Sequence, residues 1–386
     1  GAHCRPIDGC ALGATRCNGN VAQTCDADGS YHELADCDLV SEHSGAPFVC
    51  AFVDEETEDG RVVIQDFEVV PLAGQVNVEA VRSRFEDAFA AVWRGDAEND
   101  GFNRLVVAAG LSWRQVAMLR GYCKYQLQTG VTFSQAYMEE TLARYPLIAR
   151  LLVELFEARF EPGRDVKADP KTCEALRVSL TEVVPVAERE KLATILEEMG
   201  ADRALDREAQ IDACLDALAI TLEKVSSLDE DRILRRFANL AEAALRTNFF
   251  RVDGGGTPSN IIAFKFDCAR VDGMPKPRPL YEIFLTSPRV EGVHLRFGKV
   301  ARGGLRWTDR PQDFRTEILG LVKAQQVKNA VIVPVGAKGG FFPKQLPPAS
   351  DRAAWMAEGT EAYRLFIGTL LDFTDNLDGD TVVPPP

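Results

Sequence analysis

The chain has 386 residues, of which 46% are apolar and 26% charged, and its formal charge at pH 7 is −14. This composition is typical of a globular protein with two or three domains, because domains usually contain about 100 to 200 residues. Residues 1–60 hold two basic and twelve acidic residues, which leaves the rest of the chain with a charge of only −4. A nearly neutral body without a basic stripe excludes nucleic acid as a partner, and no apolar run is long enough to predict a membrane span.

Six of the ten cysteines lie in the first 50 residues, among turn-forming glycine, asparagine, aspartate and serine residues. This density predicts a small disulfide-type module over residues 1–53, similar to the cysteine-rich repeats of secreted bacterial proteins. A zinc site is disfavoured because no C-x-x-C pair occurs. The remaining cysteines are scattered singly, which is typical of a protein from a reducing compartment, so the two parts of the chain predict opposite locations.

Residues 54–250 predict a helical region. Apolar residues recur at three- and four-residue spacing from Val78 to Phe156, and Asp100 and Ser134 are suitable helix-capping residues. Further helices are expected over residues 170–226 and 228–248. Such periodicity indicates helix packing and carries no chemistry by itself.

After Phe250 the pattern changes to short alternating runs, which predict strands over residues 260–267, 281–287 and 292–298. A glycine-rich linker at 254–256 places a domain boundary near residue 250. A helix is expected over residues 316–330, followed by a strand over 330–335 and a glycine loop over 336–342. The fold class is therefore α-rich and multi-domain, with a helical region followed by an incomplete α/β domain over residues 251–386.

Three cations in this last domain are candidates for a binding site: Arg302 before a glycine pair, Lys328 at the helix end, and Lys338 within the glycine loop. Glycines beside a charged residue allow a ligand to approach closely. Enclosure next to other cations lowers the pKa of a lysine toward neutrality, which a lysine general base requires. Gln325 and Lys328 share one face of the helix, so both can contact one carboxylate. A small dicarboxylate is the ligand that this set predicts.

The same residues have a purely structural interpretation. Arg302 and Arg306 would then pair with Asp309 and Asp313, and Lys328 would be a solvated cation at a helix end. GAKGG is not a phosphate-binding loop, because Gly339 follows the lysine where serine or threonine is required. No G-x-G-x-x-G motif follows a strand, so we expect no dinucleotide site and no metal site in this sequence.

The segment RVEGVHLRFGKVARGGLRWTDRPQDFRTEILGLVKAQQVKNAVIVPVGAKGGFFPK resembles the beginning of the catalytic domain of the large bacterial NAD-dependent glutamate dehydrogenases. Residues 85–137 and 229–250 resemble the helical region that precedes this domain in the same family. The resemblance covers about residues 62–386 and implies the substrate-binding half of the catalytic domain, with L-glutamate and 2-oxoglutarate as ligands and NAD as cofactor.

The resemblance also implies residue roles. Lys338 takes the position of the catalytic lysine, which activates the water that attacks an iminium, and Arg302 with Gly303, Gln325 and Lys328 takes the position of the substrate-binding set. Arginine stands at 302 where the smaller hexameric enzymes have lysine, and a guanidinium binds carboxylates as a planar fork. The interval between Lys328 and Lys338 is also shorter than in those enzymes.

The resemblance further implies a cytoplasmic protein of glutamate catabolism that forms a homo-oligomer. Because the essential aspartate and the dinucleotide-binding domain of the family lie beyond the segment that reads TVVPPP here, we expect no dehydrogenase activity from the isolated chain. The alternative is a non-catalytic secreted or binding protein, in which the cysteine-rich module functions and the dehydrogenase segment is a relic.

Overall fold

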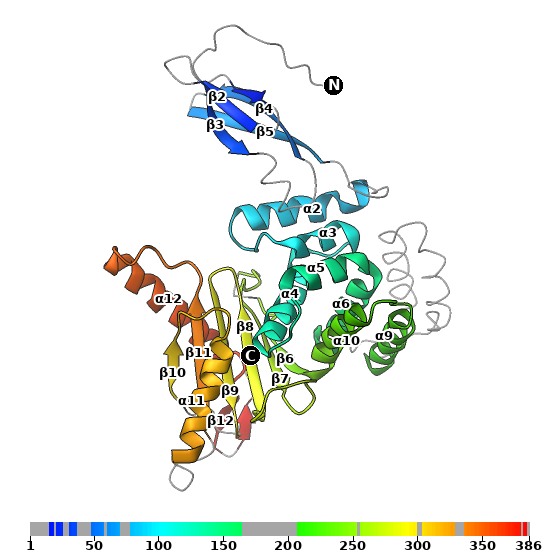
Figure 1. Ribbon diagram of the computed structural model, residues 1–386, viewed down its shortest axis with the longest axis vertical. Coiled ribbons are helices and arrows are strands. Elements are labelled where there is room, and N and C mark those ends of the chain that lie inside the picture. The colour runs from blue at the N-terminus through cyan, green and yellow to red at the C-terminus, as the bar shows by residue number, and fades with distance from the viewer. Residues whose placement is uncertain are drawn as a thin grey trace. The chain divides into compact units, whose positions relative to one another are not determined.

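The computed structural model describes residues 15–18, 21–25, 31–36, 48–57, 60–69, 78–163, 207–252, 255–298, 303–328, 336–379 and 381–383. The chain forms two compact units, shown as ribbons in Figure 1. The first contains Gly1–Asn77 and Asn99–Arg104, and the second contains Val78–Glu98 and Leu105–Pro386. The second unit holds every candidate site residue.

The first unit is built from short antiparallel strands. β1 (Thr15–Asn18), β2 (Val21–Cys25) and β3 (Tyr31–Asp36) form one sheet, and β4 (Phe48–Thr57) pairs with β5 (Gly60–Val69) as a hairpin. Strand β4 runs through the boundary that we expect after residue 53, and residues 60–69 are strand where a helix is expected. Cys4, Cys10 and Cys37 lie outside the described residues.

The helical region, most of which belongs to the second unit, agrees with the predicted periodicity. It consists of α2 (Val78–Trp93), α3 (Arg104–Ala108), α4 (Trp113–Gln128), α5 (Gln135–Arg144), α6 (Pro146–Phe160), α9 (Arg207–Leu222) and α10 (Leu228–Ala243). The predicted caps are confirmed: Ser134 accepts the Tyr137 backbone N–H at 3.2 Å at the start of α5, and Asp100 caps the 3-10 turn Gly101–Asn103. The helix expected from residue 170 lies outside the described residues up to residue 206.

A six-stranded mixed sheet forms the rest of the unit, in the order β10-β11-β9-β8-β7-β6. Its strands are β6 (Ala244–Thr247), β7 (Ile262–Asp267), β8 (Tyr281–Thr286), β9 (Val290–Arg296), β10 (Leu305–Trp307) and β11 (Ala337–Pro343). Only β10 and β11 pair in parallel, because helix α11 (Phe314–Lys328) connects them. The three strands predicted between residues 260 and 298 are confirmed.

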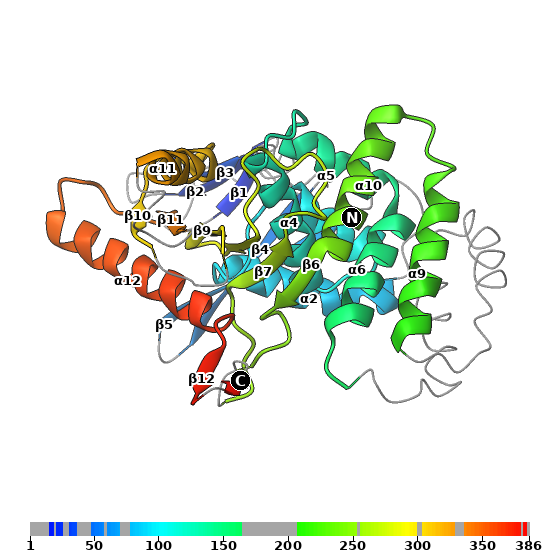
Figure 2. The ribbon, with the colours of Figure 1, turned by 90° about the horizontal axis from the view of Figure 1, so that it is seen from below.

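Helices cover both faces of this sheet. Figure 2 shows α11 and α12 (Arg352–Leu371) on opposite sides of strands β9 to β11. Phe366 of α12 packs in a core cluster with Ala263 and Ile283 of the sheet. On the other face, Tyr125 of α4 stacks on Phe266 with ring centroids 4.5 Å apart. The helical region and the sheet therefore share one core.

Two further expectations about elements are wrong. The helix expected over residues 228–248 ends at Ala243, and residues 244–247 form edge strand β6, because pairing with β7 overrides the local helical periodicity. The glycine loop expected over residues 336–342 is strand β11. An added Cβ on Gly340 would lie 2.5 Å from Cδ1 of Ile318, so the glycine allows α11 to pack closely on the strand. The strand expected over residues 330–335 lies outside the described residues.

Four charged side chains join the helical region to the sheet. Lys124 of α4 contacts Glu98 at 2.5 Å and Glu291 of β9 at 2.7 Å. Lys344, which follows β11, contacts both carboxylates as well. Burial alone would raise the pKa of Glu98, but the ammonium groups of Lys124 and Lys344 outweigh burial and lower the pKa to about 2. The cluster holds α4 against β9 and β11.

We expect this cluster to make the free energy of unfolding depend on pH in the acidic range. A carboxylate whose pKa is lower in the folded than in the unfolded chain stabilises the fold above its unfolded value of 4.5, and this contribution is lost as the pH falls toward 2. Glu98→Gln should lower the unfolding free energy at pH 7 by about 1–3 kcal/mol and flatten its decline between pH 4.5 and 2. Urea unfolding at several pH values measures both effects. Equal pH profiles for variant and wild type would contradict this assignment.

Candidate functional site

Lys338 lies at the beginning of β11, on the face of the sheet that α11 covers. Its neighbour two residues on, Gly340, faces Ile318 of α11, and alternate residues of a strand share one face. The side chain is partly buried, and no described residue forms a hydrogen bond or an ion pair with its ammonium group. Lys338 is therefore held in place by its strand, and its ammonium group has no anionic partner among the described residues.

The glycine pair before β10 lies directly beside Lys338. An added Cβ on Gly304 would lie 3.2 Å from Nζ of Lys338, and Gly339 N donates to Gly304 O at 3.3 Å. An added Cβ on Gly303 would lie 1.4 Å from the carbonyl oxygen of Ala337, a distance that no side chain tolerates. The two glycines thus let the segment before β10 run against β11 and cover the lysine stem while leaving space around Nζ.

Gln325 and Lys328 belong to the last turn of α11 as predicted. The helix runs antiparallel to β10 and β11, since it connects two parallel neighbours, so its C-terminal end lies at the sheet edge where β11 begins. This edge is the one that carries Lys338. The backbone therefore brings three of the predicted residues (Gln325, Lys328 and Lys338) to one edge, together with Gly303, whereas Arg302 lies outside the described residues.

A buried ion pair that the sequence analysis missed anchors the start of α11. Arg315 is 0% exposed and forms two hydrogen bonds with Glu282 of β8, Nε to Oε1 and Nη2 to Oε2, each at 2.7 Å. Its backbone N–H donates to Gln128 of α4 at 3.2 Å, and Nε2 of Gln128 donates to Pro311 O at 2.8 Å. Burial alone would lower the pKa of Arg315, but Glu282 outweighs it and raises the pKa. An acidic residue in the apolar run YEIFLT was the available signal.

The purely structural interpretation predicted other partners for the arginines near the glycine pair. Arg306 pairs with Glu317 at 2.6 Å, not with Asp309 or Asp313. Asp313 instead pairs with Arg310 on the surface. The carboxylates of Glu317 and Asp313 are therefore paired with these arginines and not with Lys338.

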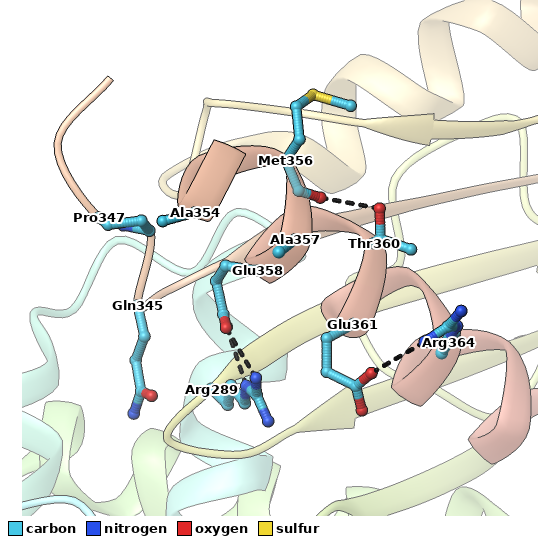
Figure 3. A pocket seen from close by; sticks show the side chains of 10 residues that line it. All are labelled: Arg289, Gln345, Pro347, Ala354, Met356, Ala357, Glu358, Thr360, Glu361 and Arg364. Atoms are coloured by element: carbon cyan, nitrogen blue, oxygen red, sulfur yellow. Dashed lines mark hydrogen bonds and ion pairs between the residues drawn. The ribbon is translucent and has the colours of Figure 1, made fainter. Parts of the chain in front are cut away.

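A shallow hollow of about 770 Å³ lies elsewhere, along the first half of α12 (Figure 3). Arg289 and Glu358 form two hydrogen bonds across it, at 2.9 and 2.7 Å. None of the predicted site residues lines this hollow, and its side chains already satisfy one another. We do not assign it to the site.

The described residues offer no place for a dinucleotide or a metal ion. The one parallel strand-to-helix connection that the structure describes, residues 308–313, contains no glycine and carries Asp309 and Asp313, which would repel a pyrophosphate. Within these ranges no group of three or more histidine, cysteine, aspartate or glutamate side chains could hold a metal, and no helix there is long and apolar enough to cross a membrane.

The structure is a helical region joined to a mixed sheet, in which a partly buried lysine lies against a glycine pair. Comparison with known proteins specifies it further. The family model for the catalytic domain of bacterial NAD-glutamate dehydrogenase matches residues 217–386, and the model for helical motif 3 of glutamate dehydrogenase matches residues 97–162. Neither match includes the cysteine-rich start, and its resemblance to secreted modules is not borne out.

Several bacterial relatives are similar over most of the chain. Proteins named NAD-specific glutamate dehydrogenase from Halomonas elongata and Mycobacterium tuberculosis are 46% and 49% identical, over 86% and 82% of this chain. The corresponding protein of Pseudomonas aeruginosa is 46% identical over 83%. The chain spans about 18% of the length of each relative. The chain belongs to the family of large NAD-specific glutamate dehydrogenases.

Proposed function

We propose that this chain forms the substrate-binding part of an NAD-dependent glutamate dehydrogenase, which converts L-glutamate, NAD⁺ and water to 2-oxoglutarate, ammonia and NADH. The observation that carries the proposal is the placement of Lys338 beside Gly303 and Gly304, at the sheet edge where α11 ends. This arrangement coincides with the part of the chain that matches the catalytic-domain family model.

The proposed roles follow from charge and position. Lys338 lies at a fixed strand position without a described anionic partner, so it can contact the α-carbon region of a bound dicarboxylate and hold or release a proton there. Gln325 and Lys328 at the helix end, with Arg302 before the glycine pair, would bind the carboxylates, and Gly303 would allow the close backbone approach. Because the described residues do not fit a dinucleotide, substrate binding is the step that we assign to them.

Two further features remain proposals: self-association of the helical region, and a cytoplasmic location. The division into a helical region (residues 54–250) and a catalytic-domain part (residues 251–386) is also a proposal. The described helices pack against the sheet, so the two parts would be in close contact.

The proposal predicts that the chain binds 2-oxoglutarate through Lys338. We expect Lys338→Met to weaken binding roughly tenfold or more, because a charge-assisted hydrogen bond contributes about 1.5–3 kcal/mol. Isothermal titration calorimetry of the full chain measures the affinity. Lys323→Met, which removes an exposed lysine from α11, is the matched control and should bind like wild type. Equal loss in both variants would indicate a nonspecific charge effect and would contradict the role of Lys338.

A further inference from the structure

Three basic side chains converge on the sheet face opposite Lys338. Arg246 of β6 and Lys265 of β7 are directly paired across neighbouring strands, and Arg296 ends β9. Alternate residues show which face they share: Ala263, two residues before Lys265, packs on Phe366 of α12 in the core cluster. Gly292, four residues before Arg296, also faces Phe366. All three cations therefore point to the α12 side.

This set of cations has one described carboxylate partner. Asp375, which follows α12, pairs with Arg246 at 2.6 Å. The ammonium group of Lys265 lies 4.9 Å from the ring centroid of Tyr281, and no described carboxylate lies within ion-pair distance of it. Asp267, two residues after Lys265 on the same face, accepts the backbone N–H of Ala269 at 3.0 Å and forms no ion pair with the three cations. Three positive charges thus face two negative charges, of which one is paired with Arg246.

Arg296 is the most buried of the three, with only 7% of its surface exposed. Its Nε donates to Nδ1 of His294 at 3.3 Å, and its Nη2 contacts Oγ1 of Thr374 at 3.5 Å, so both described partners are neutral. Burial, followed by the charge of Arg296, lowers the pKa of His294 to about 4, which keeps the imidazole uncharged at neutral pH. A buried guanidinium without a carboxylate is costly, because buried charges are normally paired.

The three positively charged side chains repel one another. Like charges directly opposite each other in a sheet are destabilising. Burial lowers the pKa of Lys265, and the neighbouring Arg246 and Arg296 lower it further, while Asp375 opposes them. An anion placed among the three side chains would remove this repulsion and supply the missing partner of Arg296.

We propose that Arg246, Lys265 and Arg296 form a second anion-binding site, which takes a small dianion, either a phosphate group or a dicarboxylate. The excess of positive charge, with Lys265 and Arg296 lacking a carboxylate partner among the described residues, fits a small anion. Guanidinium groups bind the oxygens of both ligand types as a fork, and the ammonium group adds a point charge. This site is separate from the Lys338 site, because the two lie on opposite faces of the sheet, and it does not depend on the proposed dehydrogenase function.

Calorimetric titration of the full chain with inorganic phosphate, and separately with succinate, tests this proposal. We expect saturable binding of at least one anion, and the tighter one identifies the ligand type. Lys265→Met keeps the apolar stem over Tyr281 but removes the charge, and should weaken binding at least tenfold. Lys224→Met, which removes an exposed lysine after α9, is the control and should leave this binding unchanged. Because the proposed substrate site would also take a dicarboxylate, the succinate titrations are made in the Lys338→Met background.

Thermal unfolding gives a second readout that distinguishes binding from folding. In buffer without phosphate or dicarboxylate, Lys265→Met should raise the midpoint, because it removes the repulsion with Arg246. Addition of phosphate, or of succinate in the Lys338→Met background, should raise the midpoint when Lys265 is present but not when methionine replaces it. The proposal is overturned if phosphate does not bind wild type and succinate does not bind Lys338→Met, or if Lys265→Met weakens neither binding. None of these results bears on 2-oxoglutarate binding at Lys338.

Discussion

Gly303→Ala should abolish measurable 2-oxoglutarate binding. The added methyl group would lie 1.4 Å from the carbonyl oxygen of Ala337, and both groups are backbone or fixed to it, so the segment before β10 has to move away from β11. This movement removes the Gly339 to Gly304 hydrogen bond and displaces the backbone that lies beside Nζ of Lys338. The strain should also lower the unfolding free energy by about 1–3 kcal/mol.

Gly320→Ala is the matched control for this substitution. Gly320 lies within α11, and an added Cβ there meets nothing within 4 Å. Alanine is the better helix former, so this variant should bind normally and gain about 0.5–1 kcal/mol of stability. Calorimetry and urea unfolding of both variants measure the effects. Normal binding by a folded Gly303→Ala protein would show that the glycine pair does not shape the site.

Arg315→Met should cause the largest loss of stability, about 3–5 kcal/mol, because it leaves the buried carboxylate of Glu282 without its partner. Both side chains of this ion pair are 0% exposed. The substitution also weakens the attachment of α11 to β8, and α11 carries Gln325 and Lys328 at its far end. Affinity for 2-oxoglutarate should therefore fall together with the unfolding free energy.

A double substitution distinguishes the lost partner from lost packing. Arg315→Met with Glu282→Leu removes both charges and should recover a large part of the stability, because replacing a whole buried pair by apolar groups is often neutral. Arg310→Met, which breaks an exposed pair with Asp313, should leave stability essentially unchanged. If the double variant is as unstable as Arg315→Met, packing rather than the uncompensated charge is responsible.

Local sequence patterns were sufficient to predict the elements whose form depends on residues close together in the sequence. Strands β7, β8 and β9 follow the alternating runs, and Ser134 caps α5 as its position predicts. The glycine segment of β11 could not be recognised locally. Gly339 and Gly340 are typical of a turn, and their reason is tertiary: added side chains would contact Leu305, His294 and Ile318 at 2.5 to 2.9 Å.

The candidate site also contains some residues that a local motif predicts and others that only the tertiary structure reveals. Lys338 and Gly303 were predicted from a local motif, and the structure places them together. The anchoring pair was missed because Arg315 and Glu282 lie 33 residues apart. The second cation cluster was missed because its members are single charges far apart in the sequence, and two of them lie between apolar neighbours, Lys265 in FKF and Arg296 in LRF. Only the pairing of β6, β7, β8 and β9 brings these cations to one face.

The most direct test of the Lys338 site is NMR of the full chain with its lysines reductively methylated using ¹³C-formaldehyde, which preserves their charge. Lys338→Arg and Lys265→Arg samples assign the two signals. During titration with 2-oxoglutarate we predict that the Lys338 signal shifts and saturates at ligand concentrations where the Lys265 signal has not yet moved. A Lys338 signal that stays in place while 2-oxoglutarate binds elsewhere would contradict the assignment of this glycine-flanked lysine to the substrate site.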